Sequence, residues 1–285
     1  MRPEFLRCGA FRFSLERPLI MGVINVTPDS FSDGGELVDP QLAIDRAKIQ
    51  LEQGADILDI GGESTRPGAA PVSLEMERRR VLPVLEALLP LGVPISIDTR
   101  KPAFMREVLN LGASMINDVS GFGEPSALEA VAETECCLCI MHMLGEPNNM
   151  QNHPQYDNVV ETVTQFLAGR VAQALAAGIS RERLVIDPGF GFGKTLDHNL
   201  SLLGHLSQIA DLQCAVLAGL SRKSMLGTLT GHAPRDRVHA SVAAALIAVQ
   251  NGAHIVRVHD VGPTRDALTL WAALQPHIQV RRPEE

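Results

Sequence analysis

Aromatic residues are scarce in this chain of 285 residues, which has one Trp and one Tyr although 45% of its residues are hydrophobic. The core must therefore be built mainly from Ala, Val, Ile and Leu, a composition that suits helices packed on parallel strands buried on both faces. The sequence also lacks an apolar run long enough to span a bilayer. Its first residues, MRPEFLRCG, carry charges where a signal peptide needs an apolar stretch, so we expect a cytoplasmic protein with no membrane contact.

Positive charge is in short supply as well. The 25 Lys and Arg against 33 Asp and Glu give a net charge of −8, which argues against a nucleic-acid-binding surface and against a polybasic membrane contact. Any anionic ligand must therefore be held by a few local cations rather than by the field of the whole protein.

The chain has five cysteines, an odd number, and three of them fall in the apolar segment 136–143. Cys136 and Cys139 form a C-x-x-C pattern, but both lie inside an expected strand, where neighbouring side chains point to opposite faces. The pattern favours redox or metal use when a turn and a helix follow it. We therefore expect the cysteines to be small buried core residues.

Short apolar runs alternate with helical segments along the chain. Helix starts are readable at Asp39-Pro40, an N-cap followed by a proline at the first helical position, and at Ser126-x-x-Glu129, a capping box. The length would allow two domains, but (β/α)8 barrels reach about 250 residues as one domain. We predict an α/β fold: a short N-terminal segment, 1–18, with a hairpin at 11–18, and a single (β/α)8 TIM barrel over 19–280. The eight predicted strands are residues 19–26, 57–62, 95–99, 115–120, 137–143, 184–188, 215–221 and 255–260.

A weak internal repeat supports the barrel. Gly54, Gly112 and Gly252 each stand where a helix should end, and each is followed five residues later by a polar strand residue. Because a left-handed glycine ends a helix, equal spacing delivers these polar side chains to the same height of the barrel. In such barrels the carboxyl ends of the strands form the active-site face. The polar strand ends are Asn25, Asp59, Asp98, Asn117, His142, Asp187, Ser221, Arg257 and His259. For Asp59 and His142, a purely structural role that ties strands together stays open.

These strand ends imply a type of ligand. Asp98, Asn117 and Asp187 supply acceptors that can read a flat heterocycle with amino and ring N–H groups. Ser221 opens an expected helix whose backbone N–H groups would add an anion site. Cationic side chains that suit phosphate or carboxylate oxygens are Arg222, Lys223, Arg257 and His259. The implied ligand combines a planar nitrogenous ring with an anionic group.

Two loops stand out beside the strand ends. Residues 21–35, MGVINVTPDSFSDGG, begin as a strand that ends at Asn25 and then break into a polar loop, which we interpret as a segment that meets a ligand. A solvated connector is the open alternative. Residues 187–195, DPGFGFGKT, mimic nucleotide-binding motifs, but they have the spacing of neither a P-loop nor G-x-G-x-x-G. We interpret this segment as a glycine-hinged lip that carries Phe190 and Phe192.

The motifs that identify a family are residues 21–35, DIGGESTRPG at 59–68, IDT at 97–99, INDVSG at 116–121, MHM at 141–143, DPGFGFGK at 187–194, SRK at 221–223 and RVHD at 257–260. Together they resemble the dihydropteroate synthase family of bacterial folate biosynthesis. The resemblance spans nearly the whole chain in the expected order, and no motif position departs from it. Members of that family are transferases and targets of sulfonamides. They join 6-hydroxymethyl-7,8-dihydropterin pyrophosphate to p-aminobenzoate and release pyrophosphate, assisted by Mg²⁺.

The resemblance implies a role for each matching residue. The pterin would be held by Asp98, Asn117, Asp187 and Lys223. The pyrophosphate would be held by Asn25, Thr65, Arg257 and His259, with Asn25 also a ligand of Mg²⁺. The p-aminobenzoate would lie against Thr65, Arg66, Pro67, Phe192, Ser221 and Lys223. Residues with a direct part in the SN1-like displacement would be Asp33, Lys223, Arg257 and His259. A homodimer is also implied.

Two rival functions stay open. A pterin-binding methyltransferase domain uses a similar barrel, but it has no need for the loop at 21–35 or for STRPG at 64–68. A catalytically silent pterin-binding protein would have no need for the full set of Asn25, Asp33, Lys223, Arg257 and His259. Release of pyrophosphate from the two substrates would separate the three functions.

Overall fold

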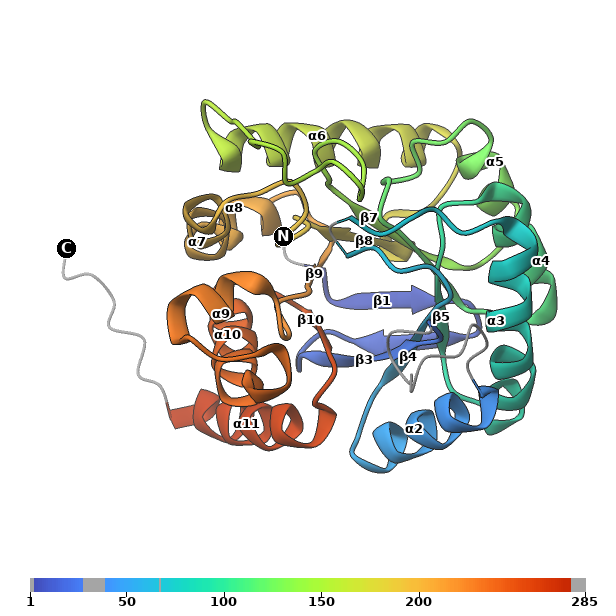
Figure 1. Ribbon diagram of the computed structural model, residues 1–285, viewed down its shortest axis with the longest axis horizontal. Coiled ribbons are helices and arrows are strands. Elements are labelled where there is room, and N and C mark those ends of the chain that lie inside the picture. Colours follow the sequence, from blue (N-terminus) through green and yellow to red (C-terminus); the bar gives the residue numbers. More distant parts are fainter. Residues whose placement is uncertain (1–2, 28–38, 67, 278–285) are drawn as a thin grey trace.

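The computed structural model describes residues 3–27, 39–66 and 68–277. A closed barrel of eight parallel strands has the order β10-β3-β4-β5-β6-β7-β8-β9, which confirms the predicted TIM barrel (Figure 1). The barrel strands are β3 (Leu19–Asn25), β4 (Ile57–Gly61), β5 (Ile95–Asp98), β6 (Met115–Asp118), β7 (Cys137–Met141), β8 (Leu184–Asp187), β9 (Ala215–Ala218) and β10 (Ile255–Val258).

Each barrel strand begins at the predicted residue and ends one to three residues earlier than predicted. The starts agree because left-handed glycines fix where the preceding helix stops: φ is 95° at Gly54, 117° at Gly112 and 107° at Gly252. The ends differ because the last polar residues leave the sheet. His142, Ser221 and His259 therefore lie in the loops just beyond the strands rather than on them.

Helices cover the outside of the barrel (Figure 1). They are α2 (Pro40–Glu52), α3 (Leu74–Leu88), α4 (Pro102–Leu111), α5 (Ala127–Ala132), α6 (Val159–Ala176), α7 (Leu196–Gly204), α8 (Leu206–Ala210), α9 (Ser224–Thr230), α10 (Val238–Gln250) and α11 (Val261–Leu274). Short 3-10 turns are η1 (Leu89–Leu91), η2 (Arg181–Arg183), η3 (Pro234–Asp236) and η4 (Gln275–His277). In the described parts of the chain, no helix is both long and apolar enough to cross a membrane.

The helix starts follow the sequence signals in part. Asp39 caps α2 as predicted, because its side chain accepts a hydrogen bond from the N–H of Gln41. The capping box predicted at Ser126 and Glu129 is wrong. Ser126 adopts a left-handed φ of 65°, and its side chain makes no capping hydrogen bond to α5.

The N-terminal hairpin lies earlier in the chain than predicted. It consists of β1 (Phe5–Cys8) and β2 (Phe11–Ser14), joined by a two-residue turn in which Gly9 has a φ of 59°. The turn signal at Gly9 therefore outweighs the later one at Pro18. Leu6 and Cys8 are buried in one apolar cluster with the inward-facing residues at the amino ends of the barrel strands. The hairpin thus closes that end of the barrel, while the domain boundary at residues 18 and 19 stays a prediction.

The inward-facing side chains change character along the barrel axis. Ile57, Met115, Val185 and Ile255 belong to the apolar cluster that the hairpin covers. Since strand side chains alternate between the two faces, the next inward position on each of these strands lies two residues later. Those positions are Asp59, Asn117, Asp187 and Arg257. The carboxyl half of the barrel interior is therefore polar.

Candidate active site

The polar layer of the barrel consists of Asp59, Asp98, Asn117, Asp187 and Arg257. Arg257 lies in its centre: Nε donates to Asp59 Oδ2 at 2.6 Å, and Nη2 donates to Asp98 Oδ2 at 3.1 Å. The Nδ2 group of Asn117 donates to the same Asp59 oxygen at 3.1 Å. Asp59 therefore joins β4 to β6 and β10 across the barrel, and the Oδ1 atom of Asn117 remains an acceptor.

Burial sets the electrostatics of the polar layer. It raises the pKa of Asp98 and of Asp187, with nearby cations opposing the shift. Burial alone would lower the pKa of Arg257, but the carboxylates of Asp59 and Asp98 outweigh it and raise that pKa. Burial favours the neutral, protonated form of the carboxyl groups, and the guanidinium of Arg257 balances the negative charge that remains. The polar layer is therefore close to neutral. A neutral ring with N–H groups fits such a layer better than an additional charge does.

Asp187 has one carboxylate oxygen engaged and one available. Its Oδ1 accepts from the N–H of Gly189 at 2.7 Å, while Oδ2 makes no hydrogen bond to any residue that the structure describes. A Cβ atom built on Gly219 would lie 4.0 Å from Asp187 Oδ2 and 4.0 Å from Arg257 Cβ. The missing side chain at Gly219 therefore leaves space beside the available oxygen.

A second group of residues lies just beyond β9 and β10. Lys223 places its Nζ 4.0 Å from the centre of the Phe192 ring, a cation–π contact. Ser221 Oγ lies 3.0 Å from His259 Nδ1 and accepts from the N–H of His259 at 3.2 Å. Burial lowers the pKa of Lys223 to about 8. Burial and then the nearby cations, Arg257 first, lower the pKa of His259 to about 3, so its imidazole is neutral at physiological pH.

The turn at residues 221–223 does not belong to a helix. Helix α9 begins at Ser224 and has seven residues, so the helix predicted to start at Ser221 starts three residues later. The reason is Arg222, whose φ of 59° is incompatible with a helix. Its N–H donates to Ser241 Oγ, and its guanidinium bonds to both oxygens of Asp260. Arg222 therefore fixes the turn that carries Ser221 and Lys223.

Asn25, Gly61, Asp98 and Asn117 form one row across four adjacent strands. A Cβ atom built on Gly61 would lie 3.8 Å from Asn25 Oδ1 and 3.8 Å from Asp98 Oδ2. Among the described residues, no group of three or more His, Cys, Asp or Glu could hold a metal ion. Asn25 Oδ1 is an oxygen of the kind that Mg²⁺ accepts, and a Mg²⁺ ion held there would take its other ligands from a bound anion and from water.

The loop after β4 lies beside the loop after β7. Thr65 is half-buried and Arg66 is exposed, and the N–H of Gly68 donates to the carbonyl of Pro147 at 3.1 Å. Within the described ranges, no hydrogen bond joins the side chains of Thr65 and Arg66 to the polar layer. Asp33 and Pro67, both predicted site residues, lie outside the described residues.

Comparisons with known proteins show the family to which the chain belongs. Residues 21–259 match the family of pterin-binding enzymes. The chain is 49% identical to dihydropteroate synthase of Escherichia coli (strain K12) over 263 residues, which cover 91% of this chain and 92% of that protein. The chain belongs to the dihydropteroate synthase family. Two solved structures are similar to this chain at 50% identity. The Burkholderia cenocepacia dihydropteroate synthase complexed with 7,8-dihydropteroate has a TM-score of 0.89, and the match covers 97% of this chain and 98% of that one. The Xanthomonas albilineans dihydropteroate synthase with 4-aminobenzoic acid has a TM-score of 0.90, and the match covers 96% of this chain and 98% of that one.

Family membership decides between the functions weighed from the sequence. The synthase is favoured over a pterin-binding methyltransferase domain and over a silent pterin-binding protein, because the relatives that cover most of the chain are synthases.

Sequence reasoning missed several contacts around the candidate site. Asp59 pairs with Arg257, which no local pattern could show, since 198 residues separate the two. Lys101 bonds to Glu63 and, at 2.6 Å, to the buried Glu77, and so holds the start of the loop after β4 against α3. A lysine three residues after the end of β5 was the available sequence signal for this contact.

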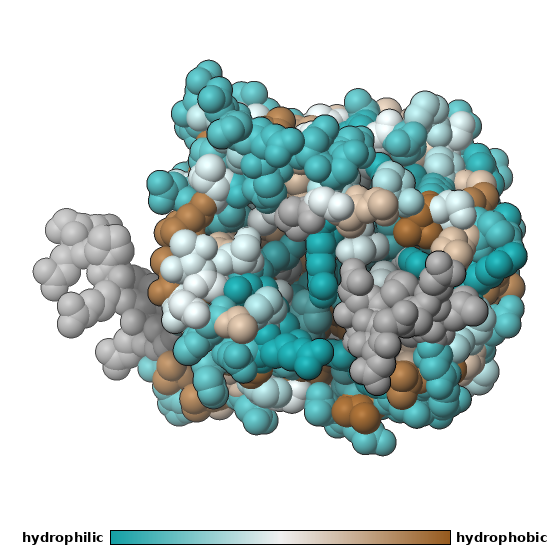
Figure 2. Space-filling model, in the orientation of Figure 1, coloured by the Kyte–Doolittle hydropathy of each residue, from teal (hydrophilic) through white to brown (hydrophobic). Residues whose placement is uncertain are grey.

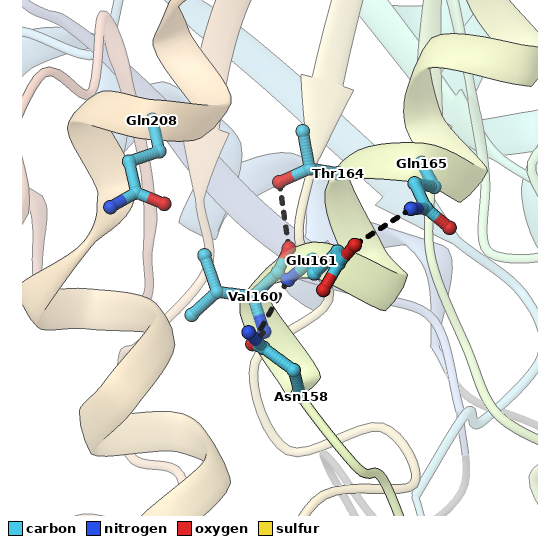
Figure 3. A pocket seen from close by; sticks show the side chains of 6 residues that line it. All are labelled: Asn158, Val160, Glu161, Thr164, Gln165 and Gln208. Atoms are coloured by element: carbon cyan, nitrogen blue, oxygen red, sulfur yellow. Dashed lines mark hydrogen bonds between the residues drawn. The ribbon is translucent and has the colours of Figure 1, made fainter.

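A separate hollow lies on the outer surface between α6 and α8, away from the polar layer. It is lined by Asn158, Val160, Glu161, Thr164, Gln165 and Gln208 (Figure 3). Asn158 caps α6, Glu161 accepts from Gln165, and Thr164 donates to the carbonyl of Val160. These polar groups serve the helix itself. On the face shown in Figure 2, by contrast, hydrophilic side chains gather around a central hollow.

Proposed function

We propose that this chain joins 6-hydroxymethyl-7,8-dihydropterin pyrophosphate to p-aminobenzoate at the polar layer, giving 7,8-dihydropteroate and pyrophosphate. The observation that carries the proposal is the set of buried acceptors, Asp98, Asn117 and Asp187, which share one end of the barrel with the cations Lys223 and Arg257. Acceptors suit the pterin ring, and cations suit the leaving pyrophosphate. Two relatives at 50% sequence identity, one solved with 7,8-dihydropteroate and one with 4-aminobenzoic acid, support the same reaction.

The pterin is proposed to bind at the available acceptor atoms. Asp187 Oδ2 and Asn117 Oδ1 have no hydrogen-bond partner among the described residues, and they would accept N–H bonds from the amino group and ring of the pterin. Asp98 keeps one oxygen for Arg257 and offers the other. Lys223, the fourth pterin residue, would donate to a ring acceptor from its position above Phe192.

The pyrophosphate is proposed to lie beyond the pterin, between Asn25, Thr65, Arg257 and His259. The Nη1 group of Arg257 has no hydrogen-bond partner in the described parts of the chain, so it can donate to a phosphate oxygen without releasing Asp59 or Asp98. His259 is neutral and accepts or donates without adding charge. Mg²⁺ held by Asn25 would neutralise the leaving group when bound.

The p-aminobenzoate is proposed to lie at the mouth of the barrel, against Thr65, Arg66, Pro67, Phe192, Ser221 and Lys223. Phe192 is 9% exposed and packs with Val119, Met141 and Met150, so it offers a fixed apolar surface. Ser221 is held by His259, which orients the turn that would meet the carboxylate of the substrate.

In the proposed reaction, the bond between the pterin methylene carbon and the pyrophosphate oxygen breaks first, and the oxygen keeps the electron pair. The methylene cation shares its charge with the pterin ring, and the carboxylates of Asp98 and Asp187 favour that charge. Arg257 and Lys223 stabilise the departing pyrophosphate. The amine of p-aminobenzoate then attacks the methylene carbon, forms the C–N bond and loses its proton to water. Asp33 is proposed to approach the cationic carbon.

The test is an assay of both products with the purified protein, the two substrates and Mg²⁺. We expect pyrophosphate and 7,8-dihydropteroate in equal amounts, and no dihydropteroate when p-aminobenzoate is left out. A protein that binds the pterin but releases no pyrophosphate would be a silent binder, and the proposal would be wrong.

Assembly and location are also proposals. The family resemblance supports a homodimer, which light scattering of the purified protein would test through its mass. All five cysteines are free and buried, which supports a reducing compartment such as the cytoplasm.

A further inference from the structure

Lys194 is a buried cation that the proposed reaction does not use. It is 3% exposed, and its Nζ lies 2.9 Å from His142 Nδ1. The same Nζ donates to the carbonyl oxygens of Gly189 and Phe192, each at 3.0 Å, and to that of His142 at 3.3 Å. An ammonium group thus lies among four acceptors, and His142 must carry its proton on Nε2.

The segment that Lys194 holds runs from Asp187 to Lys194 and turns back on itself. Gly189, Gly191 and Gly193 have positive φ values of 69°, 80° and 62°. A Cβ atom on Gly189 would lie 2.0 Å from the carbonyl oxygen of His142, so the segment packs directly on the backbone after β7. Glycine alone permits this approach.

Two site residues depend on the same segment. The N–H of Gly189 donates to Asp187 Oδ1 and so fixes the orientation of the carboxylate. Phe192 carries the ring that contacts Lys223. Lys194 donates to the backbone carbonyls of these same two residues, Gly189 and Phe192.

We propose that Lys194 is a positioning residue whose ammonium group ties residues 187–194 to His142, and that it thereby fixes both the Asp187 carboxylate and the contact of Phe192 with Lys223. The inference rests on the proposed function, because it concerns the same pterin subsite. Without the ammonium, three carbonyls would face one another with no donor, and the segment would rearrange.

The charged groups near Lys194 define how this contact responds to pH. Asp187 of β8 and Lys223 before α9 act on it in opposite directions, and burial lowers its pKa to about 7. His142 stays neutral, because burial lowers its pKa to about 3. Tyr156 donates to the carbonyl of Gly193 and, with a pKa raised to about 12, stays protonated. Between pH 6 and pH 9, Lys194 therefore loses its charge, while His142 and Tyr156 stay neutral. Lys223, with a pKa lowered to about 8, also loses its charge in this range, but it does so in the wild type and in a Lys194 variant alike, so comparing the two proteins at the same pH isolates Lys194.

The experiment compares pterin binding by the wild type, by Lys194→Met and by Tyr156→Phe. The probe is 6-hydroxymethylpterin, titrated by calorimetry at pH 6 and at pH 9. Lys194→Met removes the ammonium and keeps much of the volume. Tyr156→Phe removes a neutral hydrogen bond to the same segment and serves as the matched control.

At pH 6 we expect Lys194→Met to bind the pterin at least tenfold more weakly than the wild type, and Tyr156→Phe to bind within threefold of it. At pH 9 the deficit of Lys194→Met should shrink severalfold, because wild-type Lys194 has lost its proton as well. A residue that only stabilises the fold would not give a deficit that depends on pH. If Lys194→Met does not fold, Lys194→Gln, which keeps an N–H donor without the charge, takes its place.

Equal affinities of the wild type and the Lys194 variant at pH 6, or an equal deficit at both pH values, would overturn the inference. A wild type that binds no pterin would instead overturn the proposed function. The two failures are therefore distinguishable.

Discussion

Replacing Asp187 by Asn tests the pterin subsite most directly. The variant keeps the shape of the side chain, and its Oδ1 can still accept from the N–H of Gly189 at 2.7 Å. The available acceptor, Oδ2, becomes an NH₂ group. A donor would then face the N–H donors of the pterin in a site where Asp187 is only 5% exposed.

The size of the effect follows from two losses. A hydrogen bond to a charged acceptor is worth about 1.5–3 kcal/mol, and a buried donor left without a partner costs about 1–3 kcal/mol. The sum is about 3 kcal/mol or more, which corresponds to a loss of roughly 150-fold in pterin affinity.

The stability of the variant should change in the opposite direction. Because burial raises the pKa of Asp187, the folded state binds a proton more readily than the unfolded state, and the ionised carboxylate costs stability at pH values above the unfolded pKa. Asn removes that cost, so the melting temperature at pH 7 should be equal to or higher than that of the wild type.

Asp118→Asn is the matched control, since Asp118 is equally buried on β6 but accepts from the N–H groups of Ser120 and Phe122, each at 2.8 Å. It should lower the melting temperature and leave pterin affinity within threefold. Calorimetric titration with 6-hydroxymethylpterin measures both variants. Pterin affinity of Asp187→Asn within threefold of the wild type would show that Asp187 does not contact the ring.

Three further predictions concern the anionic side of the site. The free protein should bind Mg²⁺ only weakly, because Asn25 alone is a poor ligand set; tight binding by calorimetry without pyrophosphate would contradict this. Affinity for p-aminobenzoate should rise at least tenfold once magnesium pyrophosphate is present, because pyrophosphate near Arg257 would order the loop that carries Thr65. Equal affinities for p-aminobenzoate with and without magnesium pyrophosphate would refute this coupling. His259 should not titrate between pH 5 and pH 8 by NMR, because its pKa is lowered to about 3. The free energy of unfolding should fall as the pH drops below 6.5, because the unfolded state then binds a proton that the folded state does not. An NMR titration midpoint near pH 6 would contradict the burial argument.

The barrel was predictable because local signals fix each strand. Glycines such as Gly54 and Gly112 stop helices through their own backbone preference, and the polar residue five positions later needs no long-range information. The strand ends were less predictable, since hydrogen bonding to the neighbouring strand decides them. The hairpin was misplaced because its position also depends on long-range packing: Leu6 and Cys8, on the strand before the turn at Gly9, pack under the barrel.

The candidate site was predictable as a set of residue types but not as a network. Asp98, Asn117 and Asp187 were predicted because polar and charged side chains at the ends of buried strands need a partner or a ligand. That Asp59 would share Arg257 with Asp98 depends on the closure of the barrel, which brings β4, β5 and β10 together. Lys194 lies in a segment that lacks the spacing of a P-loop, so no local motif predicts a role for it. Its role appears when the backbone folds and three carbonyls converge on one side chain.

The hairpin that closes the amino-terminal end of the barrel has a kinetic consequence. Leu6 and Cys8 are buried against the inward-facing residues at that end, so in the described structure we expect ligands to reach the polar layer from the opposite end. The substrate bound deepest must then arrive first and leave last. In the proposed arrangement, with the pterin at the polar layer and p-aminobenzoate above it, the depth of the two subsites would impose the order of addition, and high concentrations of the second substrate should slow the exchange of the first.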